Sequence, residues 1–455
     1  MKLPARLTGS ANRRIIANAS SLVGTASATA GLGLVYWWFA AHRFSPTSVG
    51  LAYAAISAMT LLAVIAALGL GTLLMGELPR QPDRQGALIS AALMLAGVTG
   101  GVLGVLFAVI APHVSSQLGP IGGSVGTVVV FAAGVGLTTM TLVLDQALIG
   151  LLRGGLQFIR NIIFASTKFL VLIGAGLSLT HTNGLTIYST WVAGILVSLV
   201  CLLLYALRAG LHLGALRPRF RVLRGLGRAT LAHHVLNLAL QISPLTLPIL
   251  VTALLSARIG ARFDIAWLVA NGIFIIPYAL SLVLYAVGAA EPDLFRQRLR
   301  LTLGLGFASA VLASAVLFLG AGFLISIFSP AYAHDAVLPL RILILGIFPL
   351  LIKDHYVAIC RTRGRAVRTA LIVLVSSMLE LALAISGAVW AGLPGLSTGW
   401  VVALCVQSLF MLPLVYRTAR VGGNSAPSER PTKNDAQAVP YLERPSMVEV
   451  STTTE

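Results

Sequence analysis

Long apolar runs separated by short polar segments repeat along almost the whole chain. Many of these runs reach the ~20 residues that a helix needs to cross the hydrocarbon layer of a bilayer. Backbone groups in lipid must find hydrogen-bond partners within their own segment, so runs of this length are predicted to be helices. The pattern predicts about twelve such spans, at residues 18–41, 50–75, 86–111, 124–149, 161–180, 187–207, 229–255, 265–288, 301–328, 338–360, 369–390 and 397–416.

The composition supports an all-α integral membrane protein. Of the 455 residues, 57% are apolar and only 10% are charged, whereas soluble domains carry roughly 25% charged residues. The three cysteines, Cys201, Cys360 and Cys405, lie in or beside apolar runs and form no paired motif. We therefore expect no disulfide, no metal site and no bound cofactor.

The basic residues fall almost entirely on one side of the predicted bundle. The two termini and the five loops on their side hold 26 of the 32 Arg and Lys residues, the six opposite loops hold 3, and the remaining 3 lie inside spans. Short loops rich in Arg and Lys mark the cytoplasmic side, so both termini are predicted to be cytoplasmic. The net charge of +18 is accounted for by these loops, and no nucleic-acid partner is expected.

The longest basic loop divides the chain into two predicted six-helix lobes. The order is a cytoplasmic N-terminal tail (1–17), an N-lobe (18–207), the basic inter-lobe loop (208–228), a C-lobe (229–416) and a disordered cytoplasmic tail (417–455). A weak internal repeat fits this division, because "VGLAY" (49–53) and "FDIAW" (263–267) occupy matching places in the two lobes. Parallel repeats of this kind are common among transporters.

Several charged residues fall inside the predicted spans. Glu380 lies near the midplane, where an ionised carboxylate costs several kcal/mol unless it is paired, hydrated or protonated. It is either an ion- or proton-coupling group or the partner of Arg341 or Lys353. Asp354 and Asp145 are further candidates for ion coupling. The structural alternative for Asp354 is an interfacial cap formed with Lys353 and His355 at the inner end of the span, and that for Asp145 is pairing to Arg153. Lys168, Arg341 and Lys353 are the candidate cations of a substrate cavity, although Lys168 could equally snorkel to the interface.

Two predicted helices carry polar stripes. Ser21, Thr25 and Thr29 recur every four residues in the first span, which places their hydroxyls on one face. His234, Asn237 and Gln241 form a similar stripe in the seventh span, ahead of two prolines that kink a helix and free backbone carbonyls. Helix–helix hydrogen bonding is the alternative use of such residues. We expect both stripes to face one central cavity.

Four segments carry a resemblance to bacterial polysaccharide-export proteins of the O-antigen flippase-like group. They are "NASSLVGTASATAGLGLVYWWFAAHRFSPTSVGLAYAAISAMTLLAVIAALGLGTLLMGELPR" (18–80), "RGGLQFIRNIIFASTKFLVL" (153–172), "LPILVTALLSARIGARFDIAW" (247–267) and "LRILILGIFPLLIKDHYVAICRTRGR" (340–365). The resemblance implies the multidrug/oligosaccharidyl-lipid/polysaccharide exporter fold, with two six-helix lobes in a V around a cationic cavity. It also implies a location in the bacterial plasma membrane.

By the same resemblance, the chain is expected to be a flippase that moves a polyprenyl-diphosphate-linked oligosaccharide across the membrane by alternating access. Membrane lipids, and a polysaccharide polymerase or glycosyltransferases, would be its partners, and protons or sodium ions could drive it. A drug/cation antiporter of the same fold is the first alternative. A membrane enzyme of polysaccharide assembly is less favoured, because the predicted outer loops are short and hold no carboxylate cluster; we therefore expect no catalytic residues.

Overall fold

The structure is a computed structural model that describes residues 31–81, 84–178, 183–209, 218, 228–290, 294–328 and 330–420. These residues form helices and turns and contain no β-strand. Nine of the helices are long and apolar enough to cross a membrane, or ten if the bent pair α12 and α13 is counted as one span. The prediction of an all-helical, multi-pass membrane protein is therefore confirmed within this part of the chain.

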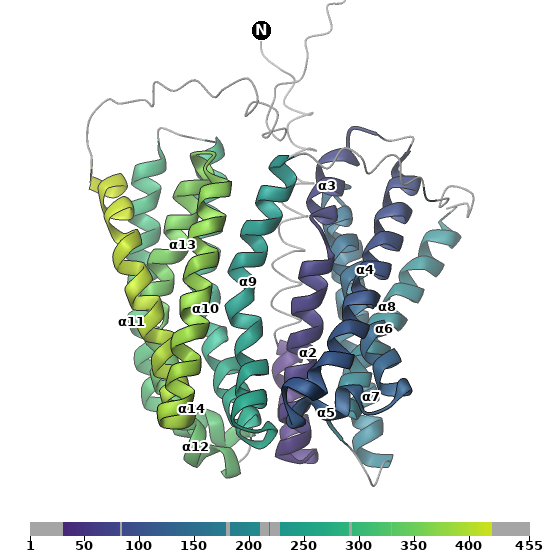
Figure 1. The fold of residues 1–455 in the computed structure, drawn as a ribbon. Helices are drawn as coiled ribbons and strands as arrows, with labels where there is room; N and C mark the ends of the chain where they lie inside the picture. The colour runs from purple at the N-terminus through teal and green to yellow at the C-terminus, as the bar shows by residue number, and fades with distance from the viewer. Residues whose placement is uncertain are drawn as a thin grey trace, which may run out of the picture.

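The N-terminal half forms one group of helices (Figure 1). The first described residues, 31–43, are helical. The elements that follow are α2 (Pro46–Ala66), α3 (Leu70–Glu77), α4 (Gln85–Val114), η2 (Ser116–Leu118), α5 (Gly119–Gly122), α6 (Val125–Gly150), α7 (Gly154–Ser178) and α8 (Gly184–Arg208). The predicted span 50–75 is broken between α2 and α3, where Leu68 and Gly69 both have positive φ angles, a backbone conformation that ends a right-handed helix.

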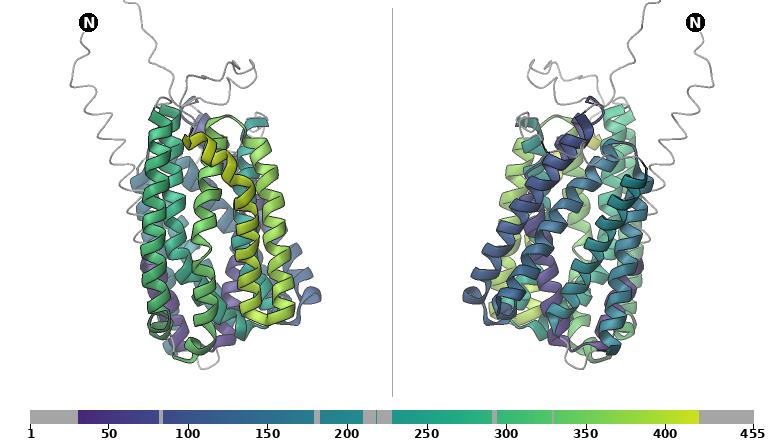
Figure 2. Two further views of the ribbon diagram at one scale, coloured as in Figure 1. Left: turned by 90° about the vertical axis from the view of Figure 1, so that its left-hand side faces the viewer. Right: turned by 90° about the vertical axis from the view of Figure 1, so that its right-hand side faces the viewer.

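The C-terminal half forms the second group, and Figure 2 shows the two groups from their outer sides. Its helices are α9 (Arg228–Leu254), α10 (Ala257–Ala290), α11 (Phe295–Phe328), α12 (Pro330–Ile344), α13 (Ile347–Thr362) and α14 (Ala366–Arg420). The predicted span 338–360 is divided between α12 and α13, which meet at a bend of 40°.

The last element, α14, is a helical hairpin rather than one rod. Ala391 and Gly392 have non-helical backbone angles, and the two arms run back along each other. A Cβ on Gly387 or Gly395 would collide with the backbone of the opposite arm, so both positions depend on glycine for this close approach. The predicted spans 369–390 and 397–416 fall on the two arms.

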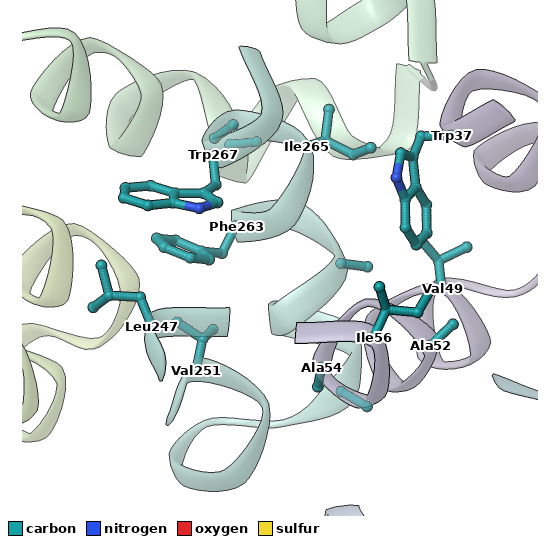
Figure 3. Close-up of a cluster of buried hydrophobic side chains, with 14 of the residues drawn as sticks. Trp37, Val49, Ala52, Ala54, Ile56, Leu247, Val251, Phe263, Ile265 and Trp267 are labelled. Atoms are coloured by element: carbon teal, nitrogen blue, oxygen red, sulfur yellow. The ribbon is translucent and has the colours of Figure 1, made fainter. Parts of the chain in front are cut away.

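The two halves meet through α2 and α10, at the end of the bundle that carries the α9–α10 turn. Gly50 of α2 lies so close to α10 that a Cβ there would fall on the carbonyl of Ala257. Figure 3 shows apolar side chains from both halves in the same buried cluster, among them Val49 and Ile56 of α2 and Phe263 of α10. We call this contact the α2–α10 junction.

Hydrogen bonds join the halves at the same end. The Ser115 hydroxyl donates to the carbonyl of Ala253 at 2.9 Å, and the backbone N–H of Ala257 donates to the side chain of Gln117 at 3.1 Å. Both bonds run from the α4–α5 turn to the α9–α10 turn. This end of the bundle is closed by packing and by hydrogen bonds.

Candidate functional site

Glu380 lies on the first arm of α14 and is the centre of a buried polar cluster. Its carboxylate accepts hydrogen bonds from Lys353 and Gln407 at 2.7 Å each, and from the Trp400 indole at 3.2 Å. The same indole N–H also lies 3.2 Å from the hydroxyl of Ser243 on α9. The cluster ties together α9, α13 and both arms of α14, and Glu380 is only 1% exposed.

The pairing of Glu380 with Lys353 is one of the two alternatives that the sequence left open. Both charged groups are buried, and the hydrogen bonds from Gln407 and Trp400 help to compensate for the water that the carboxylate has lost. Removing one member of such a pair leaves an uncompensated buried charge, at a cost of about 3–5 kcal/mol. The pair therefore stabilises the C-terminal half, whatever further part Glu380 has in transport.

A second polar group lies on the next turns of α13. Arg361 donates to the amide oxygen of Asn237 on α9 at 2.8 Å. Asp354 and Arg361 line a small cavity of about 20 Å³ together with Tyr278 and Tyr285 of α10. Asp354 thus lies between cations rather than among acids, since Lys353 and Arg361 both act on it electrostatically. Of the predicted residues, Asp354 lines this cavity, and Asn237 is bound to its neighbour Arg361.

The remaining residues of the seventh-span stripe lie on the same helix. His234 is half-buried, and its ring contacts the backbone of Ile65 in α2, so it touches the other half of the molecule. Gln241 is exposed on α9. The stripe of the first span, Ser21, Thr25 and Thr29, lies outside the described residues.

Arg341 lies at the α11–α12 contact. Its guanidinium donates to the carbonyl of Phe318 at 3.2 Å and lies 4.9 Å from the centre of the Phe318 ring. Its described contacts are with α11 rather than with the other half of the molecule. None of these described contacts places Arg341 in a central cavity.

Lys168 of α7 is held in an aromatic cage. Its ammonium lies 3.7 Å from the ring centre of Trp191, 4.7 Å from that of Phe164 and 4.9 Å from that of Tyr36. The side chain is 4% exposed, and no ion pair of Lys168 is found among the described residues. A buried cation with aromatic neighbours and no carboxylate retains unsatisfied attraction for an anion.

Asp145 of α6 pairs with Arg160 of α7, not with Arg153. The guanidinium binds both carboxylate oxygens, at 2.9 and 2.7 Å. Fork-to-fork pairs of this kind are strong and directional. The pair ties α6 to α7 within the N-terminal half.

Asp264 was not among the predicted site residues, yet it is the least compensated acid in the described structure. It lies about two turns inside α10, is 0% exposed, and neither carboxylate oxygen has a hydrogen-bond partner. The prediction placed residue 264 in a loop, one position before the span 265–288. In the structure α10 already begins at Ala257, which carries Asp264 into the α2–α10 junction.

An apolar crevice opens where the helical residues 31–43 face α10 and α11. Its volume is about 380 Å³, and both halves of the molecule contribute to its wall: Leu34, Val35, Trp38, Leu268, Val269, Gly272, Leu317, Leu324, Ile327 and Phe328. None of these side chains is charged. The crevice fits hydrocarbon better than a polar or ionic solute.

Comparisons with known proteins place this arrangement among solved transporters. The chain is similar to the inward-facing conformation of a multidrug resistance MATE family transporter of the MOP superfamily, with 14% identity, 86% of this chain and 96% of that chain covered, and a TM-score of 0.68. Its fold is that of the MATE transporters. The outward-facing conformation of a multidrug resistance MATE family transporter gives a TM-score of 0.56 at 13% identity, with 90% of this chain and 96% of that chain covered.

A MATE in complex with MaL6 is also similar, with 16% identity, 90% of this chain and 97% of that chain covered, and a TM-score of 0.58. A family model described as MatE matches residues 234–385. This match covers α9 to the first arm of α14, including Asn237, Lys353 and Glu380. No curated protein matches the chain. The MATE fold agrees with the exporter fold that the sequence resemblance implied.

Proposed function

We propose that this protein is a flippase that moves a lipid-linked anionic saccharide, of the polyprenyl-diphosphate-linked oligosaccharide class, across the membrane by alternating access. The observation that carries the proposal is the apolar crevice between the two halves. Its wall is built from Leu34, Val35 and Trp38 together with side chains of α10 and α11. A substrate with a long hydrocarbon tail can rest on such a surface without desolvating any polar group, because the side chains that line it are apolar.

The saccharide and diphosphate would follow the polar groups of the bundle. Lys168 has a buried ammonium without a carboxylate, and Arg361 presents a guanidinium beside Asn237. Arginine binds phosphate oxygens through two parallel N–H donors, and lysine binds them as a point charge. In this proposal Lys353 and Arg341 would meet the substrate after rearrangement, because Lys353 is paired with Glu380 and Arg341 rests on Phe318.

The crevice can be filled without disturbing the fold. Gly272 lines it, and a Cβ on Gly272 would meet nothing within 4 Å. Gly272→Phe should therefore insert and fold normally but occupy the space of the hydrocarbon tail. We expect at least a tenfold loss of lipid-linked saccharide flipping in proteoliposomes, measured by access of an added glycosidase to the headgroup.

Gly304→Phe is the matched control. Gly304 lies on α11, also has open space around its Cβ and does not line the crevice, so flipping should be unchanged. Deleting the gene should also cause the precursor to accumulate on the inner leaflet and deplete the surface glycan. Normal flipping by a well-folded Gly272→Phe protein would contradict the lipid-tail proposal.

A drug/cation antiporter is the second candidate function. It is favoured by the similarity to a multidrug resistance MATE family transporter and by the presence of buried acids such as Asp264. An antiporter would confer resistance to cationic drugs and leave lipid-linked precursors unchanged on deletion. The deletion strain therefore separates the two functions.

A further inference from the structure

One acid and one guanidinium of α13 share a small cavity without binding each other. Asp354 and Arg361 both line it, and no ion pair joins them in the described structure. They are seven residues apart, which separates their backbones by about 10 Å along the helix axis. Arg361 binds Asn237 through a terminal nitrogen, while its Nε is buried and has no hydrogen-bond partner among the described residues. The cavity therefore offers both an acceptor and a donor.

The α10 wall of this cavity carries three hydroxyl groups. Tyr278, Ser281 and Tyr285 line it, and both tyrosines act electrostatically on Arg361. The Ser281 hydroxyl donates to the carbonyl of Tyr278 at 2.8 Å, and its oxygen can still accept a hydrogen bond. A tyrosine side chain combines an apolar ring with a hydroxyl that both donates and accepts. Hydrogen-bonding groups and apolar ring surface thus occur together at this cavity.

The cavity lies beside the gap between the two halves of the molecule. His234, Asn237 and Gln241 are spaced by three and four residues on α9, which places them on one side of the helix. His234 contacts the backbone of Ile65 in the other half, so this side of α9 is turned towards that half. Asn237 and Gln241 are exposed, and polar groups inside a membrane face a water-filled space or protein rather than lipid. Arg361, which is bound to Asn237, therefore lies at the edge of this gap.

The opposite charges at the cavity select the kind of ligand. Arg361 would attract a phosphate that Asp354 would repel, and an ammonium group would meet the reverse. A hydroxyl is both donor and acceptor, so neighbouring hydroxyls of one molecule can donate to the carboxylate and accept from the guanidinium. The volume of about 20 Å³ admits one such group. The rest of the molecule would lie against Tyr278, which is 50% exposed. A sugar ring, with its hydroxyls and its apolar C–H face, has this combination of groups.

We propose a binding subsite for an uncharged sugar ring of the substrate, formed by Asn237, Tyr278, Tyr285, Asp354 and Arg361. The ring would stack on Tyr278 and insert one hydroxyl into the cavity. The carboxylate would accept hydrogen bonds from the sugar, and the guanidinium and the tyrosine hydroxyls would donate to it.

The subsite and the apolar crevice can serve one molecule. Gly272, which lines the crevice, precedes Tyr278 by six residues, or about 9 Å along α10. A single amphiphilic molecule can therefore contact both places. This inference rests on the proposed function and deepens it, because it assigns Arg361 to the saccharide and leaves the diphosphate to Lys168.

Two lipid probes separate the saccharide from the rest of the substrate. One is the polyprenyl-diphosphate-linked saccharide extracted from the membranes of the host cell, and the other is polyprenyl diphosphate without a saccharide. The Kd of each probe for the purified full chain is measured by native mass spectrometry. The wild type should bind the saccharide-bearing lipid about tenfold more tightly than the bare lipid, because hydrogen bonds to charged groups add to the affinity.

Two variants remove contacts to the sugar. Asp354→Asn replaces a carboxylate oxygen with an amide, and Tyr278→Phe removes only a hydroxyl and keeps the ring. The affinity for the saccharide-bearing lipid should fall by about tenfold in Asp354→Asn and about fivefold in Tyr278→Phe, with the affinity for the bare lipid unchanged. Tyr278→Phe keeps the test decisive if the Asp354→Asn protein fails to fold.

Tyr205→Phe is the matched control. Tyr205 lies on α8 in the other half and is 56% exposed, close to the 50% of Tyr278, so this variant should bind both probes as the wild type does. An unchanged preference for the saccharide-bearing lipid in the folded subsite variants would overturn the subsite. An equal loss of affinity for both probes would also overturn it, because these residues would then act on the diphosphate. A wild-type protein that binds neither probe would instead contradict the proposed function itself.

Discussion

Glu380 gives a prediction that separates stability from transport. Glu380→Gln leaves the ammonium of Lys353 buried without its counter-charge, so the variant should lose about 3–5 kcal/mol of stability. Gln407 and Trp400, which donate to the carboxylate, would also lose their charged acceptor. The loss should appear as a lower midpoint of thermal unfolding in detergent.

The double variant Glu380→Gln, Lys353→Met restores charge balance in the same cluster. Replacing a buried ion pair with neutral groups is often neutral or stabilising, so stability should recover to near that of the wild type. Transport by this double variant is then informative: normal flipping would make the pair structural, and a loss of flipping in a stable protein would assign it to transport.

Replacing Lys168, unlike replacing Glu380, should not lower the stability of the protein. Lys168→Met keeps the length and the packing of the side chain and removes a buried charge that has no described ion pair. The lost cation–π attraction is worth about 2 kcal/mol, which is less than the several kcal/mol needed to desolvate an ammonium. We expect unchanged or higher thermal stability, with flipping reduced at least tenfold if Lys168 binds the diphosphate. Lower stability would contradict this account of the cage.

The charges inside the spans could be predicted from sequence, but their partners could not. The predicted position of Glu380 near the membrane midplane was enough to predict that it needs a partner. Lys353 was one of the two candidates, with Arg341. The rotation of a helix about its axis, which selects the partner, depends on neighbours that are distant in sequence. Asp264 was missed for a different reason. Because charged residues usually end an apolar span, the span was predicted to begin after Asp264. In the structure, packing against α2 lets α10 begin before Asp264, at Ala257.

At the scale of helices, Gly50 controls how closely α2 approaches α10. Because a Cβ would fall on the carbonyl of Ala257, Gly50→Val cannot be accommodated while the junction is closed. We expect the closed fraction to fall at least tenfold, measured by the distance between spin labels on cysteines introduced at positions 114 and 254, the last residues of α4 and α9. The packing within each half is untouched, so the protein should still insert and fold.

Gly33→Val serves as the control for that variant. Gly33 lies in the helical residues 31–43, and a Cβ there meets nothing within 4 Å. Its label distances should match those of the wild type. An unchanged distance in Gly50→Val would show that the junction opens or shifts at negligible cost, which would contradict the closed packing described here.

The helices themselves follow closely from the apolar pattern, while their breaks do not. The predicted spans fall on described helices, apart from residues 18–30 and 179–180, which lie outside the described part of the chain. The apolar pattern predicted neither the break at Leu68 and Gly69 nor the bend between α12 and α13, because apolar residues continue across both. The "VGLAY" and "FDIAW" segments, noted only as a weak repeat, lie on the two helices that form the junction (Figure 3).

For the whole molecule, packing and hydrogen bonds close one end of the bundle. The halves are hydrogen-bonded at the α9–α10 turn, and the similarity is greater to an inward-facing structure than to an outward-facing one, with TM-scores of 0.68 and 0.56. The charge pattern predicts that the same turn is on the outer side. By this predicted orientation, the closed end would face away from the cytoplasm.

This orientation can be tested in intact cells. Val125 lies at the start of α6, near the closed end, and is 82% exposed, whereas Val367 follows the basic α13–α14 turn and is 61% exposed. Arg361, Arg363, Arg365 and Arg368 surround that second position, and such clusters are retained in the cytoplasm. In a cysteine-free background, a membrane-impermeant maleimide should label Val125→Cys from outside and label Val367→Cys only after permeabilisation. The reverse pattern would invert the molecule in the membrane, so that the end sealed by the α2–α10 junction would face the cytoplasm.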